Sequence, residues 1–307
     1  MTETSENKKD GRNPSKRKVI FPILLMVIIG LAGWGTVRAI QSMKISSLFN
    51  SGIEKAAEGD HPGAIEDFSR VIESDPEHAG AYWGRGSVEA KRGNLQKAIE
   101  DFTRSLELDP NAEVYFARGL IHAQKDVRDL AMKDYTKALE LDPKYVDAWL
   151  NRGWIRHRLG DSDGAKADFT RTIEMSGERS PSRIALAYYY RGLVRYEGDL
   201  DMEGAFKDYD KAIEVDPKCT LAWVNRGYAR LQNGEHQEAI ADCTRALELN
   251  PPPEAYFAYW YRGEAFAKEK RYKEAVADLR EAFRLCKKEG NRSIIERLLK
   301  NTLEKAE

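Results

Sequence analysis

The chain has 307 residues, of which 32% are charged, and its formal net charge at pH 7 is −1. Its 49 lysines and arginines are balanced by 50 aspartates and glutamates, which argues against a nucleic-acid partner, because proteins that bind nucleic acids usually carry a basic excess. The three cysteines are an odd number and form no Cys-x-x-Cys pair. A disulfide framework is therefore not expected.

An uncharged segment near the amino terminus predicts a membrane anchor. Residues 1–18 are polar and basic, and residues 19–37 then form an apolar stretch without a charge. As a helix, this stretch would span roughly 28 Å, close to the hydrocarbon thickness of a bilayer. We predict a disordered basic tail over residues 1–18 and one transmembrane helix over residues 19–40, with membrane contact through residues 19–37.

The side of the membrane follows from the flanking charges. Six lysines and arginines precede the apolar stretch, and three follow it within a comparable distance. The positive-inside rule then places the amino terminus in the cytoplasm and the rest of the chain outside it. A cleaved signal peptide stays open as an alternative, although Val37-Arg38-Ala39 is a poor cleavage site and the apolar stretch is longer than the usual 7–15 residues or so.

An Arg-Gly pair recurs through the rest of the chain at near-constant spacing. A serine replaces the arginine before the first glycine of the series, Gly52. A period of 33 to 39 residues indicates one supersecondary unit repeated seven times and stacked into a solenoid. The six pairs are Arg85-Gly86, Arg118-Gly119, Arg152-Gly153, Arg191-Gly192, Arg226-Gly227 and Arg262-Gly263.

Other residue types keep phase with this glycine. An aromatic residue usually stands four positions before it, an alanine twelve positions after it, and a proline closes most units. The pattern resembles the tetratricopeptide repeat, whose consensus has Trp, Leu-Gly, Tyr, Ala, Phe and Pro at these intervals. Here arginine replaces the consensus leucine in six units. A large residue sixteen or seventeen positions after the glycine completes the pattern: Phe68, Phe102, Tyr135, Phe169, Tyr209, Cys243 and Leu279.

The resemblance implies an all-α, right-handed superhelical solenoid of about seven helical hairpins over residues 45–287. The units are predicted to begin near residues 45, 79, 112, 146, 185, 220 and 256. An apolar pattern predicts a capping helix over residues 292–305, since the last repeat of a solenoid needs a cover. Five extra residues at 177–181 predict an irregularity that divides the first four units from the last three.

An aspartate stands directly before the large residue of every unit. We interpret the arginines and aspartates as a structural ion-pair ladder within and between hairpins, because a planar guanidinium binds a carboxylate through two parallel hydrogen bonds. The alternative is a ladder of charges used for binding. The seven aspartates are Asp67, Asp101, Asp134, Asp168, Asp208, Asp242 and Asp278.

No motif in the chain predicts chemistry. The five histidines fall at different phases of the repeat, and none has metal-ligand spacing to another histidine, cysteine or aspartate. There is no glycine-rich phosphate loop, nucleophile elbow or His-Glu-x-x-His sequence. We therefore expect neither an enzyme nor a bound cofactor or metal.

The resemblance implies a binding surface on the first helix of each hairpin, which in this family lines a concave groove that usually holds an extended peptide. Aromatic residues there would supply rigid contact area, and asparagines two positions before the glycine would hold a ligand backbone or carboxylate. Alternatively, the aromatics pack on the neighbouring hairpin. The predicted groove residues are Phe49, Trp83, Phe116, Asn151, Trp154, Tyr189, Asn225, Tyr228 and Trp260.

Two further features bear on the partner. Four arginines, Arg156, Arg158, Arg195 and Arg230, lie further along the first helices and are predicted to add a cationic strip. The family's clamp for chaperone carboxyl termini needs lysines, but aromatic residues stand at three of these places, so we do not predict chaperone binding.

The sequence thus predicts a non-enzymatic, membrane-anchored scaffold that binds a protein or peptide in its groove. One alternative keeps the fold and makes the chain a secreted or periplasmic assembly factor for a multiprotein complex. Another places the repeats in the cytosol, as in the import receptors of the mitochondrial outer membrane.

Overall fold

The computed structural model describes residues 38–177, 180–249 and 255–306. Within these ranges every regular element is an α-helix, which confirms the all-α prediction. The predicted tail (residues 1–18) and nearly all of the predicted transmembrane helix (residues 19–40) lie outside the described residues. Among the helices that the structure does describe, none has the length and apolar character needed to cross a bilayer.

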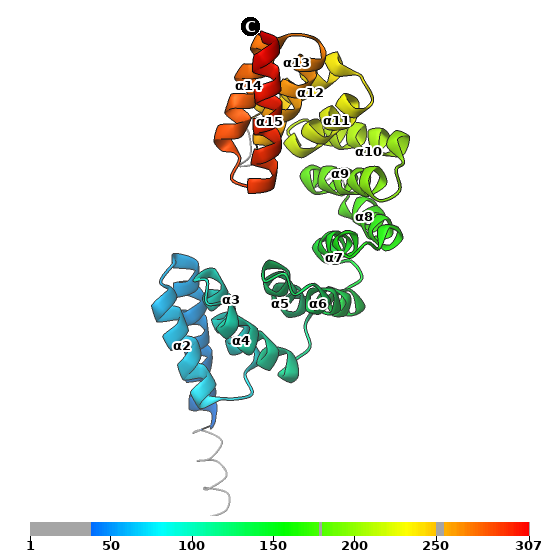
Figure 1. The fold of residues 1–307 in the computed structure, drawn as a ribbon. Helices are drawn as coiled ribbons and strands as arrows, with labels where there is room; N and C mark the ends of the chain where they lie inside the picture. Colours follow the sequence, from blue (N-terminus) through cyan, green and yellow to red (C-terminus); the bar gives the residue numbers. More distant parts are fainter. Residues whose placement is uncertain (1–37, 178–179, 250–254, 307) are drawn as a thin grey trace, which may run out of the picture. The chain divides into compact units, whose positions relative to one another are not determined.

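The helices follow one another along the chain as pairs, which Figure 1 shows. A first helix is described over residues 38–58. The others are α2 (His61–Ser74), α3 (Ala79–Lys91), α4 (Leu95–Leu108), α5 (Ala112–Gln124), α6 (Arg128–Leu141), α7 (Val146–Arg158), α8 (Ser162–Ser176), α9 (Pro181–Glu197), α10 (Met202–Val215), α11 (Thr220–Gln232), α12 (His236–Glu248), α13 (Tyr256–Lys268), α14 (Tyr272–Leu285) and α15 (Glu289–Ala306).

Local chemistry sets where these helices begin. The side chains of Asp161 and Asp201 accept hydrogen bonds from backbone N–H groups of the first turn of α8 and α10, both at 2.9 Å, and so satisfy donors that have no partner within the helix. The helix α9 begins at Pro181, four residues before the predicted start of its unit, because proline is well tolerated in the first turn of a helix.

The turn inside each hairpin requires a residue with left-handed backbone. Gly93, Gly160 and Gly234 take it with φ between 82° and 83°, at no steric cost. Asp126, Leu200 and Lys270 take the same region at φ of 56° to 60°, so three turns keep the geometry without a glycine. The turn geometry therefore repeats more faithfully than the turn sequence.

The repeat glycine lets the two helices of a hairpin approach closely. A Cβ atom built on Gly153 would lie 2.8 Å from Cε1 of Phe169, and one on Gly119 would lie 2.7 Å from Cε1 of Tyr135. Both large side chains are fully buried. Glycine and the large residue are thus two halves of one contact, and each hairpin buries an apolar side chain that favours folding by about 1.5–3 kcal/mol.

The described helices form two compact units, which meet between Asp109 and Pro110. The first contains the helix at 38–58 and α2 to α4, and the second contains α5 to α15. The predicted division at residues 177–181 is wrong. Ala187 and Val194 of α9 pack in one core cluster with Phe169 of α8, so the inserted residues leave that contact intact.

The carboxy-terminal helix closes the second unit. Ile295 of α15 is fully buried and shares a cluster with Tyr256 of α13 and Leu279 of α14. Asn291 donates a hydrogen bond to the Tyr256 hydroxyl at 3.0 Å. The helix α15, longer than the predicted 292–305, therefore covers the apolar side of the last hairpin, as a terminal repeat requires.

Candidate functional site

The arginine and aspartate columns form a ladder of bidentate ion pairs. In six hairpins, the Nε and Nη2 atoms of the arginine donate to the two carboxylate oxygens of the aspartate at distances of 2.6 to 3.0 Å. The structural interpretation of these columns is confirmed. The pairs are Arg85–Asp101, Arg118–Asp134, Arg152–Asp168, Arg191–Asp208, Arg226–Asp242 and Arg262–Asp278.

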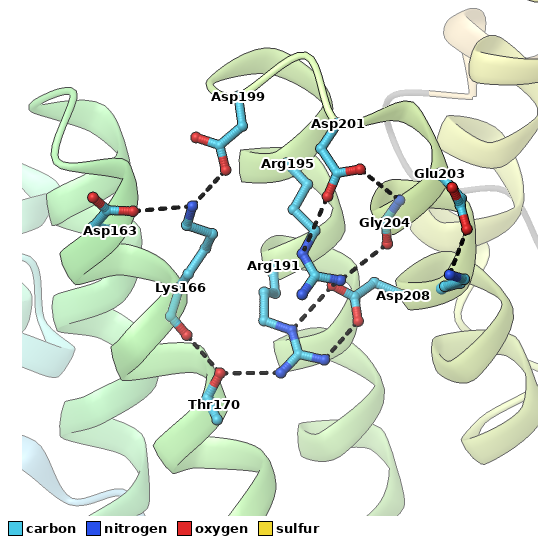
Figure 2. Close-up of polar contacts among 11 residues, drawn as sticks. Asp163, Lys166, Thr170, Arg191, Arg195, Asp199, Asp201, Glu203, Gly204 and Asp208 are labelled. Atoms are coloured by element: carbon cyan, nitrogen blue, oxygen red, sulfur yellow. Dashed lines mark hydrogen bonds and ion pairs between the residues drawn. The ribbon is translucent and has the colours of Figure 1, made fainter.

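The third nitrogen of the guanidinium reaches the preceding hairpin. Nη1 of Arg191 donates to the hydroxyl of Thr170 on α8 at 3.0 Å, and Figure 2 shows this bond beside the Asp208 pair. Arg262 makes the same contact with Thr244 at 3.1 Å, and Arg226 binds Asp210 at 2.6 Å. One arginine thus fixes three helices: its own, the second helix of its hairpin, and the one before.

The aromatic column supports this ladder. The aromatic residue three positions before each arginine lies under its guanidinium, with the Cζ atom 4.7 to 5.8 Å from the ring centroid. A delocalised cation over a ring face is attracted by the ring quadrupole. The six rings are Tyr82, Tyr115, Trp149, Tyr188, Trp223 and Tyr259.

The first hairpin builds its ladder from different residues. Asp67 is buried, and among the described residues no arginine binds it; instead, the Ser51 hydroxyl and the Lys55 ammonium donate to its Oδ2, each at 2.6 Å. Burial alone would raise the pKa of Asp67, but these two hydrogen bonds outweigh it and hold the pKa below its usual range. The serine of the first unit therefore fills the role of the repeat arginine.

The predicted cationic strip is wrong for three of its four members. Arg156, Arg195 and Arg230 each donate to the aspartate of their own hairpin, with N–O distances of 2.8 to 2.9 Å. Figure 2 shows Arg191 and Arg195 converging on Asp208. A buried carboxylate that accepts two guanidiniums is well satisfied, so these arginines serve the ladder. The fourth, Arg158, is exposed.

The histidines also pair with carboxylates. His157 lies 3.4 Å from Glu197, His236 lies 3.0 Å from Glu269, and both pairs join successive hairpins. Burial lowers the pKa of His122, which lies 3.7 Å from an aspartate of the ladder. Within the part of the chain that the structure describes, no three histidine, cysteine, aspartate or glutamate side chains are grouped so that they could hold a metal ion.

The predicted groove residues lie on what we call the first-helix face: the positions two or three before, and one after, each repeat glycine. In the first compact unit, which ends at Asp109, Phe49 and Trp83 lie on this face. Their rings contact Phe68 and Phe102, with centroid distances of 5.8 and 5.4 Å. Both side chains are half-buried and line an apolar hollow of about 450 Å³.

In the second compact unit, which begins at Pro110, packing between aromatic rings covers part of the first-helix face. Phe116 lies 4.9 Å from the Tyr145 ring, and Trp154 lies 5.0 Å from Tyr190, both as centroid distances. Tyr189 is only 7% exposed and belongs to the core cluster of α9 to α11. Tyr189 therefore stabilises the hairpins in this structure and offers almost no surface to a partner.

The two asparagines use their amide nitrogens inside the protein. Nδ2 of Asn151 donates to the Asp147 carbonyl at 2.8 Å, and Nδ2 of Asn225 donates to the Leu221 carbonyl at 2.9 Å and to the Tyr189 hydroxyl at 3.3 Å. The amide oxygen of each has no donor among the described residues. An acceptor of this kind suits a backbone N–H group of a ligand and repels a carboxylate.

The carboxy-terminal part of the face is aromatic. The Tyr228 ring lies 4.5 Å from that of Tyr261 and 5.8 Å from that of Tyr196. Trp260 stacks on Phe257 with an interplanar angle of 11°. These rings remain half-buried and so combine a fixed position with exposed area.

Family models described as tetratricopeptide repeat match residues 49–113, 112–145, 134–167, 220–252 and 244–288. Together these segments make up more than half of the sequence. The chain belongs to the tetratricopeptide repeat family. Such repeats build extended surfaces that bind other proteins, and they typically perform no chemistry.

Known relatives share the repeat over part of their length. Protein SGT1 homolog from Oryza sativa subsp. japonica is 35% identical over 81 residues, which are 26% of this chain and 22% of that protein. The solved structure of MamA protein, 26% identical, covers 58% of this chain and 94% of its own, with a TM-score of 0.52. The chain thus matches only about a fifth of the curated relative's length.

A structural match extends over most of the chain. The crystal structure of a tetratricopeptide repeat protein from Parabacteroides merdae covers 85% of this chain and 99% of its own, with a TM-score of 0.63 and 19% identity. At this identity the match shows the fold alone. It agrees with the succession of hairpins from α2 to α14 described above.

The sequence analysis did not predict several residues that lie on or beside this face of the tetratricopeptide repeats. Tyr190 and Tyr261 stand two positions before the repeat glycine, in the column where only the asparagines were singled out. Tyr196 stands four positions after it, outside the columns that define this face, but its ring lies against that of Tyr228 on the face. The available signal was the alternation of asparagine and tyrosine two positions before the glycine.

Proposed function

We propose that the chain is a membrane-anchored scaffold that holds an extended segment of a partner protein along the first-helix face of its tetratricopeptide repeats. The observation that carries the proposal is that the ladder accounts for the arginines, the aspartates and the supporting aromatic residues of the other columns. These residues are therefore occupied within the fold. The groups that remain on the first-helix face are half-buried rings and amide acceptors. Rings supply contact area at low entropic cost, and acceptors fix the orientation of a peptide backbone.

The anchor in this proposal is the predicted transmembrane helix over residues 19–40. Its support is the uncharged stretch and the character of the helix that follows. Ile40 and Met43 are 67% and 72% exposed at the start of the helix at 38–58, where apolar side chains would meet the bilayer surface. The repeats would then stand outside the cytoplasm, directly on the membrane.

The alternatives differ in the fate of the amino terminus and in the side of the membrane. A secreted or periplasmic assembly factor would lose residues 1–39 on maturation, by cleavage after Val37-Arg38-Ala39, which mass spectrometry of the mature chain would show. A receptor facing the cytosol would expose its repeats to protease added to intact organelles. We expect a retained amino terminus and repeats that protease reaches only from the extracytoplasmic side.

Removal of rings from the first-helix face should weaken partner binding without unfolding the chain. For Trp154→Ala with Tyr228→Ala in the full chain, we expect the proteins that co-purify with wild type to fall about tenfold or more, as at binding hot spots. The control is Arg104→Ala with Arg171→Ala, which removes two exposed side chains of second helices. Equal recovery with both double variants, at unchanged helicity, would refute the proposed surface.

A further inference from the structure

The apolar hollow of the first compact unit lies between the helix at 38–58 and α3. We call it the anchor pocket. Its volume is about 450 Å³. Phe49, Ile53 and Ala57 line it from the first of these helices, and Trp83 and Val88 line it from the second. The exposed surface of its walls is almost entirely apolar.

Two glycines set the floor of the pocket. A Cβ atom on Gly52 would lie 2.8 Å from Cε1 of Phe68, and one on Gly84 would lie 2.6 Å from Cζ of the same ring. The Phe68 ring therefore lies against both helix backbones and is fully buried, and it occupies the space that a side chain at Gly84 would need. Gly52 is the repeat glycine of the first unit, but Gly84 stands two positions before the next one, where a glycine occurs in no other unit.

The fifth unit shows what a side chain at this position does. There the residue two before the repeat glycine is Tyr190, and its ring stacks on Phe169 with centroids 5.6 Å apart and an interplanar angle of 25°. Phe169 is the counterpart of Phe68. Tyr190 thus covers the large residue of the preceding hairpin, and the Trp154 ring lies against it at 5.0 Å. At the equivalent position of the second repeat stands Gly84, which has no side chain to cover Phe68 in this way.

The rim of the pocket carries one charge. Among the described residues that line it, Lys91 at the end of α3 is the one charged side chain. It is exposed, and no carboxylate of the described residues lies within 4.0 Å of its ammonium. Lys55, on the neighbouring helix, is instead paired with Asp67 at 2.6 Å. An apolar cavity with a lysine on its edge is complementary to an apolar side chain that has an acidic neighbour.

We infer that the anchor pocket takes a bulky apolar side chain, leucine, methionine or phenylalanine, from the partner segment, and that an aspartate or glutamate within about three residues of it pairs with Lys91. This inference rests on the proposed function and names the chemistry of the partner. The apolar side chain fixes the register of the segment on the first-helix face. The acidic residue fixes its direction.

Selection from a displayed library of random twelve-residue peptides on the full chain, held in lipid nanodiscs, tests the inference. Wild type should enrich peptides with a bulky apolar residue and a nearby acid. Ala57→Phe, at an exposed position of the pocket wall, should weaken the binding of the selected peptides about tenfold or more in fluorescence anisotropy. Lys91→Glu should shift the preference from acidic to basic neighbours.

The matched controls are Ala241→Phe on α12 and Lys97→Glu on α4, which make the same exchanges at exposed sites outside the pocket. Both should bind the selected peptides as wild type does. If these peptides bind Ala57→Phe normally but lose affinity for Trp154→Ala with Tyr228→Ala, the anchor pocket is refuted while the proposed function stands. If wild type enriches no peptide, both are refuted.

Discussion

Replacement of Asp168 by alanine should lower the free energy of unfolding of the region around α7 to α9 by about 3–5 kcal/mol. Asp168 is 1% exposed and accepts three hydrogen bonds of 2.8 to 2.9 Å from Arg152 and Arg156. Its loss leaves the buried guanidinium of Arg152 without its counter-charge, and it leaves Arg156 with only the Asp161 carboxylate, 3.5 Å away. Because a solenoid is held by contacts between neighbours, the loss should be greatest in this region.

Hydrogen exchange of the full chain measures this effect residue by residue. Amides of α7, α8 and α9 should lose protection in Asp168→Ala, and those of α13 to α15 should change little. The control is Glu174→Ala on the same helix, which removes an exposed partner of Arg171 and should cost about 0–1 kcal/mol. If the two variants lose the same protection, the ladder is not what holds the hairpins.

Replacement of Phe169 by alanine should cost about 3–5 kcal/mol, in the same region but for a different reason. The side chain is fully buried against Gly153 within its hairpin, and it packs with Ala187 and Val194 of the next one. It therefore joins α7 to α8 within its hairpin, and it also joins α8 to α9, the helices on either side of the insertion at 177–181. The cavity left by the ring should uncouple α8 from α9.

A conservative exchange at this position tests how much of the destabilisation comes from the lost volume of the Phe169 side chain. Phe169→Leu keeps most of the apolar contact and should cost less than half as much as Phe169→Ala, with both read from denaturant unfolding and hydrogen exchange. If hydrogen exchange shows no loss of protection specific to α8 and α9 in Phe169→Ala, the bridging role is contradicted.

Periodicity made the fold and the ladder predictable from the sequence. An aspartate and an arginine at constant phase in almost every repeat predict a repeated contact, and the Arg191–Asp208 pair shows that this contact persists in the longer fifth repeat. The same argument could not find the second arginine on each aspartate. Arg156 and Arg195 lie one turn beyond the repeat arginine, and spacing alone does not say whether such a side chain turns inward or to solvent.

The boundary between the two compact units and the burial of Tyr189 could not be predicted from the sequence, for similar reasons. The period is regular across Asp109 and Pro110, so no insertion marks the boundary between the two units. Conversely, the insertion at 177–181 is taken up by α9, which has 17 residues where α7 and α11 have 13, and α8 and α9 still pack together. Tyr189 occupies a column whose members in the first four repeats are half-buried, but in this hairpin it is buried and packs with Tyr209 and Asn225, which lie on other helices.

The central claim is that partner contact falls on the first-helix face and that the ladder is structural. Site-specific photo-crosslinking of the full chain in cells, with p-benzoylphenylalanine at Leu120 or Trp154 and, for comparison, at Arg104 or Arg171 of second helices, tests it most directly. We predict that the same partner is crosslinked from Leu120 and Trp154 and from neither second-helix position. Equal crosslinking from both sets, or crosslinking only from the second helices, would contradict the account.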